Sequence, residues 1–359
     1  MNRRFWFVAL ASLAACAALW WLFSHWDGGG FRWDEFRKVL AQVDAGWLAT
    51  CLFVTLLSYV VRALRWKAMM APVRPNASFR NLLSATCVGF TAVVFFGRPG
   101  ELVRPWLIAT RERVSLSSQL AVWFLERIFD LLAVVLLFGF ALTGVDKYAA
   151  VSPRLTGILQ AGGYLALIAG VACVMVLMGT ALFSDRARQL CDWMAGYLPA
   201  KLAVRARKSL DSFLQGLETT GNLRALLRIA MWSAVEWFVI GAGMYALFQA
   251  FGPAMEQFDL TATLIYMGFV AFGSAITLPG IGGGLQVSSM LILTELFGLP
   301  LATASACTLL VWITSWLTIV PVGLLFAFSE GLQWKNLKQM SELDAEGGAP
   351  PAKPGEVAR

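Results

Sequence analysis

The sequence predicts an all-α, multi-pass membrane protein with about six full transmembrane helices and two oppositely oriented, broken helical hairpins. Three observations lead to this fold class. Of the 359 residues, 58% are hydrophobic and only 14% are charged, a balance that a soluble domain does not have. Six apolar runs are long enough to be spans, and two further runs are broken by Gly and Pro.

The six unbroken runs are distributed over most of the chain. An α-helix needs about 20 apolar residues to cross a membrane. The runs lie at about residues 5–24, 46–61, 119–143, 158–183, 229–250 and 302–328. Residues 1–330 are therefore expected to form one transmembrane domain.

Lys and Arg in the short loops predict the orientation of the spans. Basic residues precede the first run, follow the second as Arg62 and Arg65, and gather again at 184–228. We expect these at the cytoplasmic interface, together with both termini. The apolar residues of 184–228 recur at helical spacing, so this segment either lies on the membrane as an amphipathic helix or only obeys the positive-inside rule. The polar, Pro- and Gly-rich residues 331–359 predict a disordered cytoplasmic tail.

The two broken runs, at 82–110 and 260–298, enter the membrane from opposite sides according to the same loop charges. Each is either a re-entrant hairpin or a pair of short spans. Few apolar residues follow Glu101, which favours re-entry for the first, whereas 260–278 is long enough to cross. Two opposed, interrupted segments are typical of transporters built from inverted repeats, whose site lies at the breaks.

Glycine and proline at these breaks predict irregular backbone that lines a cavity, because lipid leaves such backbone without hydrogen-bond partners. The alternative is that the glycines only allow close helix packing. The residues concerned are Gly97, Pro99, Gly100, Pro279, Gly280, Gly282, Gly283 and Gly284.

Ionisable residues lie inside the apolar runs, where each costs several kcal/mol unless it is paired or hydrated. The first broken run has Arg98, Glu101 and Arg104, and the third full run has Glu126, Arg127 and Asp130. Glu126 and Asp130 are four residues apart and share a helix face, which could receive Arg98 or Arg104. Such pairs either bind substrate or only hold the hairpin in place.

Helices that restart after each break would point their N-termini at the membrane interior, which favours an anion such as a phosphate-bearing headgroup. The single His25 lies at the outer end of the first run, where a histidine is more often incidental than catalytic, the cysteines form no CxxC, and no residue cluster has metal-ligand spacing. We therefore expect no enzyme activity, no cofactor, no metal and no nucleic-acid partner.

Four motifs resemble the lysylphosphatidylglycerol synthase/flippase transmembrane-region family over residues 5–330. They are RALRWKAMM (62–70), GRPGELVRPWLI (97–108), ERIFDLLAVVLLF (126–138) and LPGIGGGLQVSSMLIL (278–293). The resemblance implies a bacterial or archaeal inner-membrane protein whose relatives move an aminoacylated phospholipid between leaflets. It assigns importance to Arg65, Trp66, Gly97, Gly100, Glu101, Arg104, Glu126, Arg127, Asp130, Pro279, Gly280 and Gly282.

One departure concerns the last motif, where the family often has an Arg-Glu pair and this chain has Leu285 and Gln286. Because Gln286 is neutral, we expect the ionisable groups of the first hairpin and the third run to bind the lipid headgroup. The preferred hypothesis is a translocator of anionic or aminoacylated phospholipid, or of polyisoprenoid or hopanoid lipid. The alternatives are a secondary transporter of a small anion and a non-transporting partner of a lipid-modifying or hopanoid/polyisoprenoid pathway enzyme.

Overall fold

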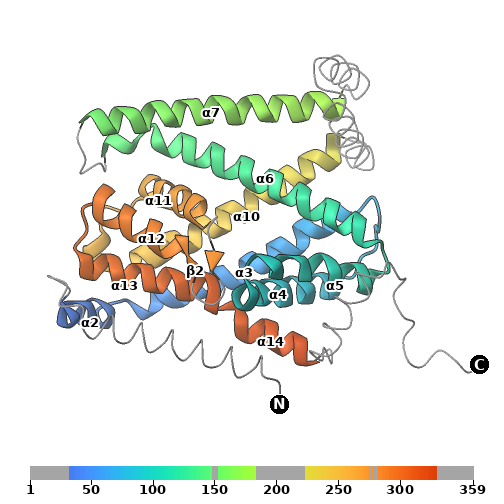
Figure 1. Cartoon of the computed structure of the whole chain (residues 1–359), viewed down its shortest axis with the longest axis horizontal. Coiled ribbons are helices and arrows are strands. Elements are labelled where there is room, and N and C mark those ends of the chain that lie inside the picture. Colours follow the sequence, from blue (N-terminus) through green and yellow to red (C-terminus); the bar gives the residue numbers. More distant parts are fainter. Residues whose placement is uncertain (1–31, 148–152, 183–222, 275–276, 279–281, 330–359) are drawn as a thin grey trace, which may run out of the picture.

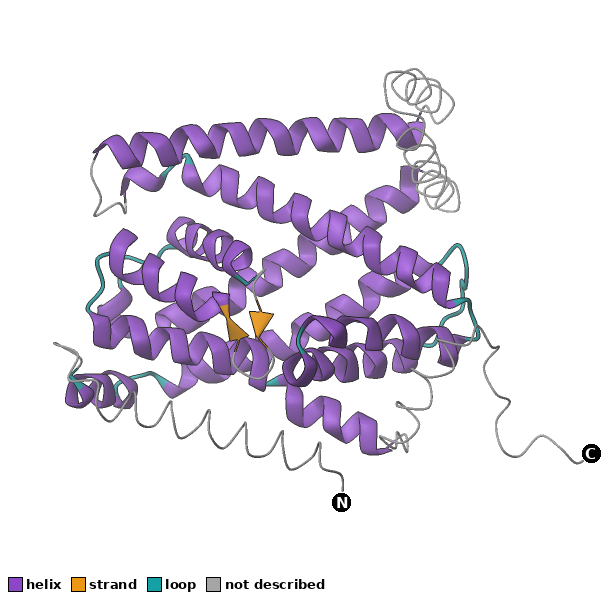
Figure 2. Ribbon diagram, in the orientation of Figure 1, coloured by secondary structure: helices purple, strands orange, loops and turns teal. Residues whose placement is uncertain are grey.

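The structure is a computed structural model that describes residues 32–147, 153–182, 223–274, 277–278 and 282–329. Helices make up nearly all of this part of the chain (Figure 2). The predicted span at 5–24, most of the basic segment at 184–228 and the tail at 331–359 lie outside the described residues.

The α-helices are α2 (Trp33–Ala41), α3 (Ala45–Met70), α4 (Phe79–Phe96), α5 (Val103–Glu112), α6 (Leu116–Leu142), α7 (Pro153–Leu182), α10 (Leu223–Gln249), α11 (Leu260–Gly273), α12 (Gly284–Leu291), α13 (Leu301–Trp312) and α14 (Ile319–Ser329). Short 3₁₀ turns are η1 (Arg98–Leu102), η2 (Val145–Lys147) and η3 (Gly252–Met255), and π-helical turns are η4 (Ile292–Leu296) and η5 (Ile313–Leu317).

Five helical segments are long and apolar enough to cross a membrane: α3, α4, α10, residues 156–175 of α7, and the continuous α13–η5–α14 segment. Helix α6 is as long, at 27 residues, but carries three ionisable residues. The all-α polytopic fold class is therefore confirmed. Each predicted full span within the described ranges is helical.

The boundary predicted for the second span was wrong, because α3 does not end at residue 61 but continues to Met70. The prediction ended the span at its first positive charges, Arg62 and Arg65. Both side chains pair with carboxylates in the protein interior, so their charges do not require the end of the apolar helix.

The first broken run folds as two antiparallel arms, α4 and α5, joined by η1 (Figure 1). Gly97 ends α4 with φ 67°, a conformation that glycine adopts without strain. Gly100 then returns so close to α4 that an added Cβ would lie 2.5 Å from the backbone of Ala92. Two of the predicted hinge glycines thus have specific steric reasons to be glycine.

The second broken run has α11 as its first arm and α12 with η4 as its second. Between them β1 (Thr277–Leu278) and β2 (Gly282–Gly283) pair antiparallel, and Gly283 has φ 83°. Helix α11 has 14 residues, about 21 Å of helix, which is short of the roughly 30 Å hydrocarbon core. This length favours re-entry for the second run as well, and re-entry in a membrane stays a prediction.

Two hydrophobic cores are joined by shared helices. One core lies among α10, α11, α12 and α13, and the other among α3, α4, α5 and α6. Helices α3, α6 and α10 contribute residues to both cores. The arginines and carboxylates of the candidate site lie on these shared helices and on the first hairpin.

Candidate functional site

Arg65 of α3 is the centre of a buried ion-pair network. Its side chain is fully buried and contacts three carboxylates: Glu126 at 2.7 Å, Asp130 at 2.6 Å and Glu236 at 2.9 Å. The sequence predicted Arg65 at the level of the cytoplasmic interface; the structure shows that its side chain is inside the protein, and its depth in the membrane stays a prediction. A guanidinium supplies five N–H donors in a fixed planar fork, which suits it to join carboxylates from α6 and α10 at once.

Two further arginines pair with Glu126 and Asp130 of α6, one from the first hairpin and one from α6 itself. Arg104 of the first hairpin pairs with Glu126. Arg127 contacts Glu126 at 3.3 Å and Asp130 at 3.1 Å. Of the two arginines considered from the sequence, Arg104 reaches this face, and Arg98 pairs with Glu101 at 3.3 Å.

Glu236 of α10 completes the network and was missed in the sequence. Its side chain is fully buried between Arg65 and Arg62, whose Nη1 lies 2.8 Å from Glu236 Oε1. The signal was available, because Glu236 is an ionisable residue within the apolar run 229–250. The cost of burying a charge, applied to that run, predicts that Glu236 has a basic partner.

Aromatic rings and a glycine hold Arg104 in position. Its guanidinium lies 4.1 Å from the ring centre of Trp66 and 5.4 Å from that of Phe90, as in cation–π pairs. Trp66 is fixed in turn, because its indole N–H donates to Gln119 at 3.0 Å. Gly89 makes room for the arginine, since an added Cβ would lie 2.6 Å from Arg104 Cβ.

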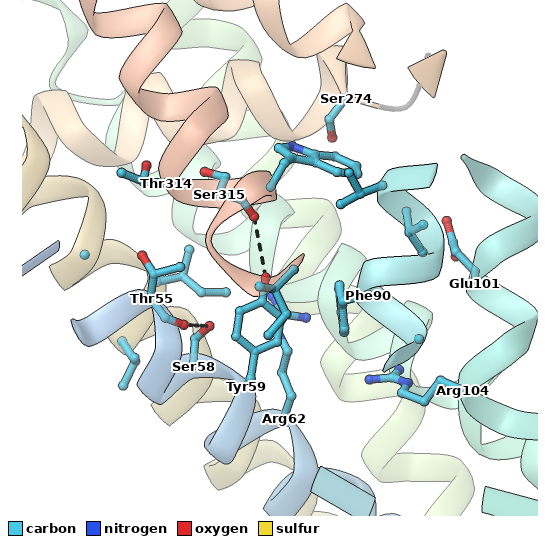
Figure 3. A pocket seen from close by; sticks show the side chains of 18 of the residues that line it. Thr55, Ser58, Tyr59, Arg62, Phe90, Glu101, Arg104, Ser274, Thr314 and Ser315 are labelled. Carbon is cyan, nitrogen blue, oxygen red and sulfur yellow. Dashed lines mark hydrogen bonds between the residues drawn. The ribbon is translucent and has the colours of Figure 1, made fainter. Parts of the chain in front are cut away.

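A cavity of about 330 Å³ lies beside the network, between α3, α4, α10 and η5 (Figure 3). Four arginines and one carboxylate line it: Arg62, Arg98, Arg104, Arg127 and Glu101. Hydroxyl groups of α3, α11 and η5 also face it, and apolar residues of α4 and α10 supply much of the remaining wall. The cavity is thus amphipathic, and its lining carries more positive than negative charge.

The predicted site residues divide into three groups around this cavity. Arg98, Glu101, Arg104 and Arg127 line it, and so does Arg62, expected only at the interface. The carboxylates Glu126 and Asp130 lie behind the arginines and are not among the lining residues. Gln286 also lies outside the lining, although it was expected to contribute.

The glycine motif of the second hairpin was expected to line the cavity, and its described residues do not line this one. Pro279 and Gly280 lie outside the described residues, while Gly282, Gly283 and Gly284 form β2 and the start of α12. Helix α12 is held on α11 and α13 by buried hydroxyls: Ser289 lies 2.7 Å from Tyr266 and 2.6 Å from Thr308. Ser274, just before the motif, is the residue of this hairpin at the cavity.

Metal binding has no support among the described residues, where no three His, Cys, Asp or Glu side chains gather as ligands. The arrangement is a set of fixed positive donors beside a partly apolar space. Such a site binds an anion attached to an apolar group.

Long apolar helices, two broken hairpins and a buried arginine–carboxylate network together define a polytopic α-helical membrane protein with an internal cavity. The chain belongs to the lysylphosphatidylglycerol synthase TM region family, whose model matches residues 7–323. This match confirms the resemblance seen in the four motifs.

One curated relative is the glycosyltransferase AglD of Haloferax volcanii, 26% identical over 228 residues. The match covers 57% of this chain and 36% of that protein, so the chain spans about a third of the length of the relative it matches. No solved structure matches the chain.

Proposed function

We propose that this protein is a lipid translocator of the bacterial inner membrane, with both termini in the cytoplasm. It binds the phosphate-bearing headgroup of a membrane lipid in the cavity and moves it between leaflets. The observation that carries this proposal is the amphipathic cavity between membrane-length helices, whose lining combines four arginines with many apolar side chains. No covalent step is part of the proposal.

Charge within the cluster supports an anionic ligand. The cluster contains five arginines (Arg62, Arg65, Arg98, Arg104 and Arg127) and four carboxylates (Glu101, Glu126, Asp130 and Glu236). This leaves an excess of one positive charge in a place where an unbalanced charge is costly. A phosphodiester carries one negative charge and would neutralise the excess.

A buried donor supports the same ligand. Arg104 is 4% exposed, lines the cavity, and its Nη1 has no hydrogen-bond partner among the described residues. A buried donor without a partner costs roughly 1–3 kcal/mol, and more when it is charged. Nη1 itself is covered by protein atoms, so a phosphate oxygen would accept from it, and remove this cost, only once the Arg104 side chain turns toward the cavity.

The network divides into a part that holds the fold together and a part that meets the ligand. Arg65 is fully buried and absent from the cavity lining, so its role is to hold α3, α6 and α10 together. Arg62, Arg98, Arg104 and Arg127 face the cavity and are the proposed headgroup ligands. The proposal thus gives the two roles that the sequence left open, ligand binding and structural pairing, to different residues.

Transport of headgroup-labelled lipid tests the proposal directly. The full chain is reconstituted into vesicles, and the leaflet of a labelled anionic phospholipid, polyisoprenoid phosphate or hopanoid is read with a membrane-impermeant quencher. Arg98→Gln is compared with Arg74→Gln, because both side chains are 54% exposed and only Arg98 lines the cavity.

We expect transfer by the unsubstituted chain, about tenfold slower transfer by Arg98→Gln and unchanged transfer by Arg74→Gln. Absence of transfer for every lipid class, or equal rates for the two variants, would overturn the proposal. Uptake of a soluble anion without any lipid requirement would instead identify a secondary transporter of a small anion.

The relative gives a specific reason to keep a second candidate. Because that protein is named a glycosyltransferase, this chain could hold a lipid for a separate lipid-modifying enzyme without moving it. The second candidate predicts lipid binding that is sensitive to Arg98→Gln, no transfer by the purified chain, and recovery of a lipid-modifying enzyme with it from native membranes.

A further inference from the structure

Besides the arginines, hydroxyl groups line the cavity and form a second polar surface. Thr55 and Ser58 of α3 and Thr314 and Ser315 of η5 contribute to it (Figure 3). Ser274 at the end of α11 adds a fifth hydroxyl. The proposed phosphate ligands do not include these groups, so their presence requires a different part of the ligand.

Three hydroxyls of this surface are oriented as acceptors. Ser58 Oγ donates to the backbone carbonyl of Thr55 at 2.6 Å, Thr314 Oγ1 to that of Leu310 at 2.8 Å, and Ser274 Oγ to that of Ala271 at 2.8 Å. A hydroxyl has one donor and two acceptor lone pairs, and in these three the donor is already engaged with a nearby backbone carbonyl. Their oxygens therefore offer lone pairs, which suit a ligand that brings O–H donors.

The backbone at η5 is shaped to present these groups. A π-helical turn, such as this one at Ile313–Leu317, is rare and is frequently found at functional sites. It places Thr314, Ser315 and Trp316 together on the cavity wall. The hydroxyl of Tyr59, from α3, lies 3.5 Å from the Ser315 carbonyl oxygen and joins η5 to α3 across the wall.

A cationic headgroup finds no matching carboxylate in this cavity. Glu101 is the one acidic residue of the lining, and it is paired with Arg98. Glu126 and Glu236 are fully buried behind the arginines and held by them. An ammonium group would face four arginines, and like charges at such a site are repelled.

We infer that the cavity selects a phosphodiester lipid whose headgroup is hydroxylated and carries no cation, such as a glycerol or a single sugar. This inference rests on the proposed function and names its substrate class. The arginines bind the phosphate, and the hydroxyl surface accepts from the ligand's O–H groups. A cavity of about 330 Å³ is near the lower end for ligand pockets, which suits one such unit rather than an oligosaccharide.

Lipid binding to the purified full chain tests the inference, with four lipids that share acyl chains. These are phosphatidylglycerol, phosphatidic acid, phosphatidylethanolamine and lysyl-phosphatidylglycerol. We expect phosphatidylglycerol to bind about tenfold more tightly than each of the other three, because only it combines a phosphodiester with alcohol O–H donors and no cation. Equal affinity for phosphatidylglycerol and the lysyl lipid overturns the inference.

Isosteric variants assign the preference to the hydroxyl surface. Thr55→Val combined with Thr314→Val should lower phosphatidylglycerol affinity about tenfold and leave phosphatidic acid affinity unchanged. Thr50→Val is the matched control, since Thr50 also donates to a carbonyl of α3, at 2.9 Å, but lies outside the cavity lining. An equal loss for both lipids in the double variant overturns the inference.

Two further arms separate this inference from the proposed function and from a soluble ligand. Leaflet transfer is measured on the same samples. A headgroup preference without transfer overturns the proposed translocator but not the inferred selectivity. Transfer without a headgroup preference overturns the inferred selectivity but not the translocator. Soluble glycerol phosphate should bind far more weakly than the lipid, and equal binding overturns the assignment to a lipid.

Discussion

Arg65 of α3 and Glu236 of α10 lie 2.9 Å apart with both side chains fully buried. Their pairing joins two helices that belong to both hydrophobic cores. The same arginine contacts Glu126 and Asp130 of α6. One side chain therefore connects three membrane helices, and its partners are expected to control stability more than surface charges do.

Replacing Glu236 with Gln tests this connection. The change leaves Arg65 and Arg62 without one carboxylate in the interior, and removing one member of a buried pair costs about 3–5 kcal/mol. We expect a clear fall in the thermal unfolding temperature of the purified protein. Glu35→Gln, which removes an exposed pair with Arg32, should cost less than about 1 kcal/mol. Similar unfolding temperatures for the two variants would contradict this role of Glu236.

Gly89→Ala tests the space that α4 leaves for Arg104. The new Cβ would lie 2.6 Å from Arg104 Cβ, so α5 has to shift, at about 1–3 kcal/mol for overpacking. We expect lower thermal stability and weaker binding of anionic lipid. Gly157→Ala is the control, because an added Cβ there meets nothing within 4 Å and should be neutral or slightly stabilising. Unchanged lipid affinity in Gly89→Ala would argue against precise placement of Arg104.

Tyr266→Phe tests the hydroxyl groups that hold the second hairpin. The change removes the contact of Tyr266 with Ser289 and leaves the buried Ser289–Thr308 pair incomplete. We expect a loss of about 1–3 kcal/mol, measured as a lower unfolding temperature. Tyr164→Phe, at a side chain that is 55% exposed, should have no measurable effect. If both variants unfold alike, the hydroxyl contacts do not stabilise the hairpin.

Arg104→Lys tests the planar donor geometry rather than the charge. Lysine keeps the positive charge beside Glu126 but loses the planar guanidinium that stacks on Trp66 and supplies several N–H donors. We expect a folded protein with about tenfold weaker binding of anionic lipid in an equilibrium titration. Arg74→Lys, outside the cavity, serves as the comparison. Full affinity in Arg104→Lys would show that charge alone suffices.

The fold class and part of the ion-pair network could be predicted from the sequence, and the remainder could not, for physical reasons. Glu126 and Asp130 were predictable because their spacing and their cost in an apolar run both require basic partners. Arg65 was placed at an interface because a span was ended at its first charges, although paired charges are compatible with a continuing helix. The cost of a charge in an apolar run also predicts a basic partner for Glu236, but Glu236 is the single charge of its run and has no neighbouring charge that draws attention to it.

The hydroxyl surface could not be predicted from the sequence. Ser and Thr are common in membrane helices, where they often donate to their own backbone. Thr55 and Thr314 are more than 250 residues apart and meet only because α3 and η5 face the same space. Likewise, the glycine motif correctly predicted a break between the helices of the second hairpin. The sequence pattern does not show whether the residues at that break face the cavity.

The single unbalanced positive charge of the arginine cluster has an electrical consequence for transport. If the proposed translocator is correct, the empty site is cationic and the site loaded with a monoanionic headgroup is neutral. A charge that crosses the membrane field changes free energy by about 2.3 kcal/mol per 100 mV. The loaded step would then be insensitive to voltage, and membrane potential would act on the return of the empty protein.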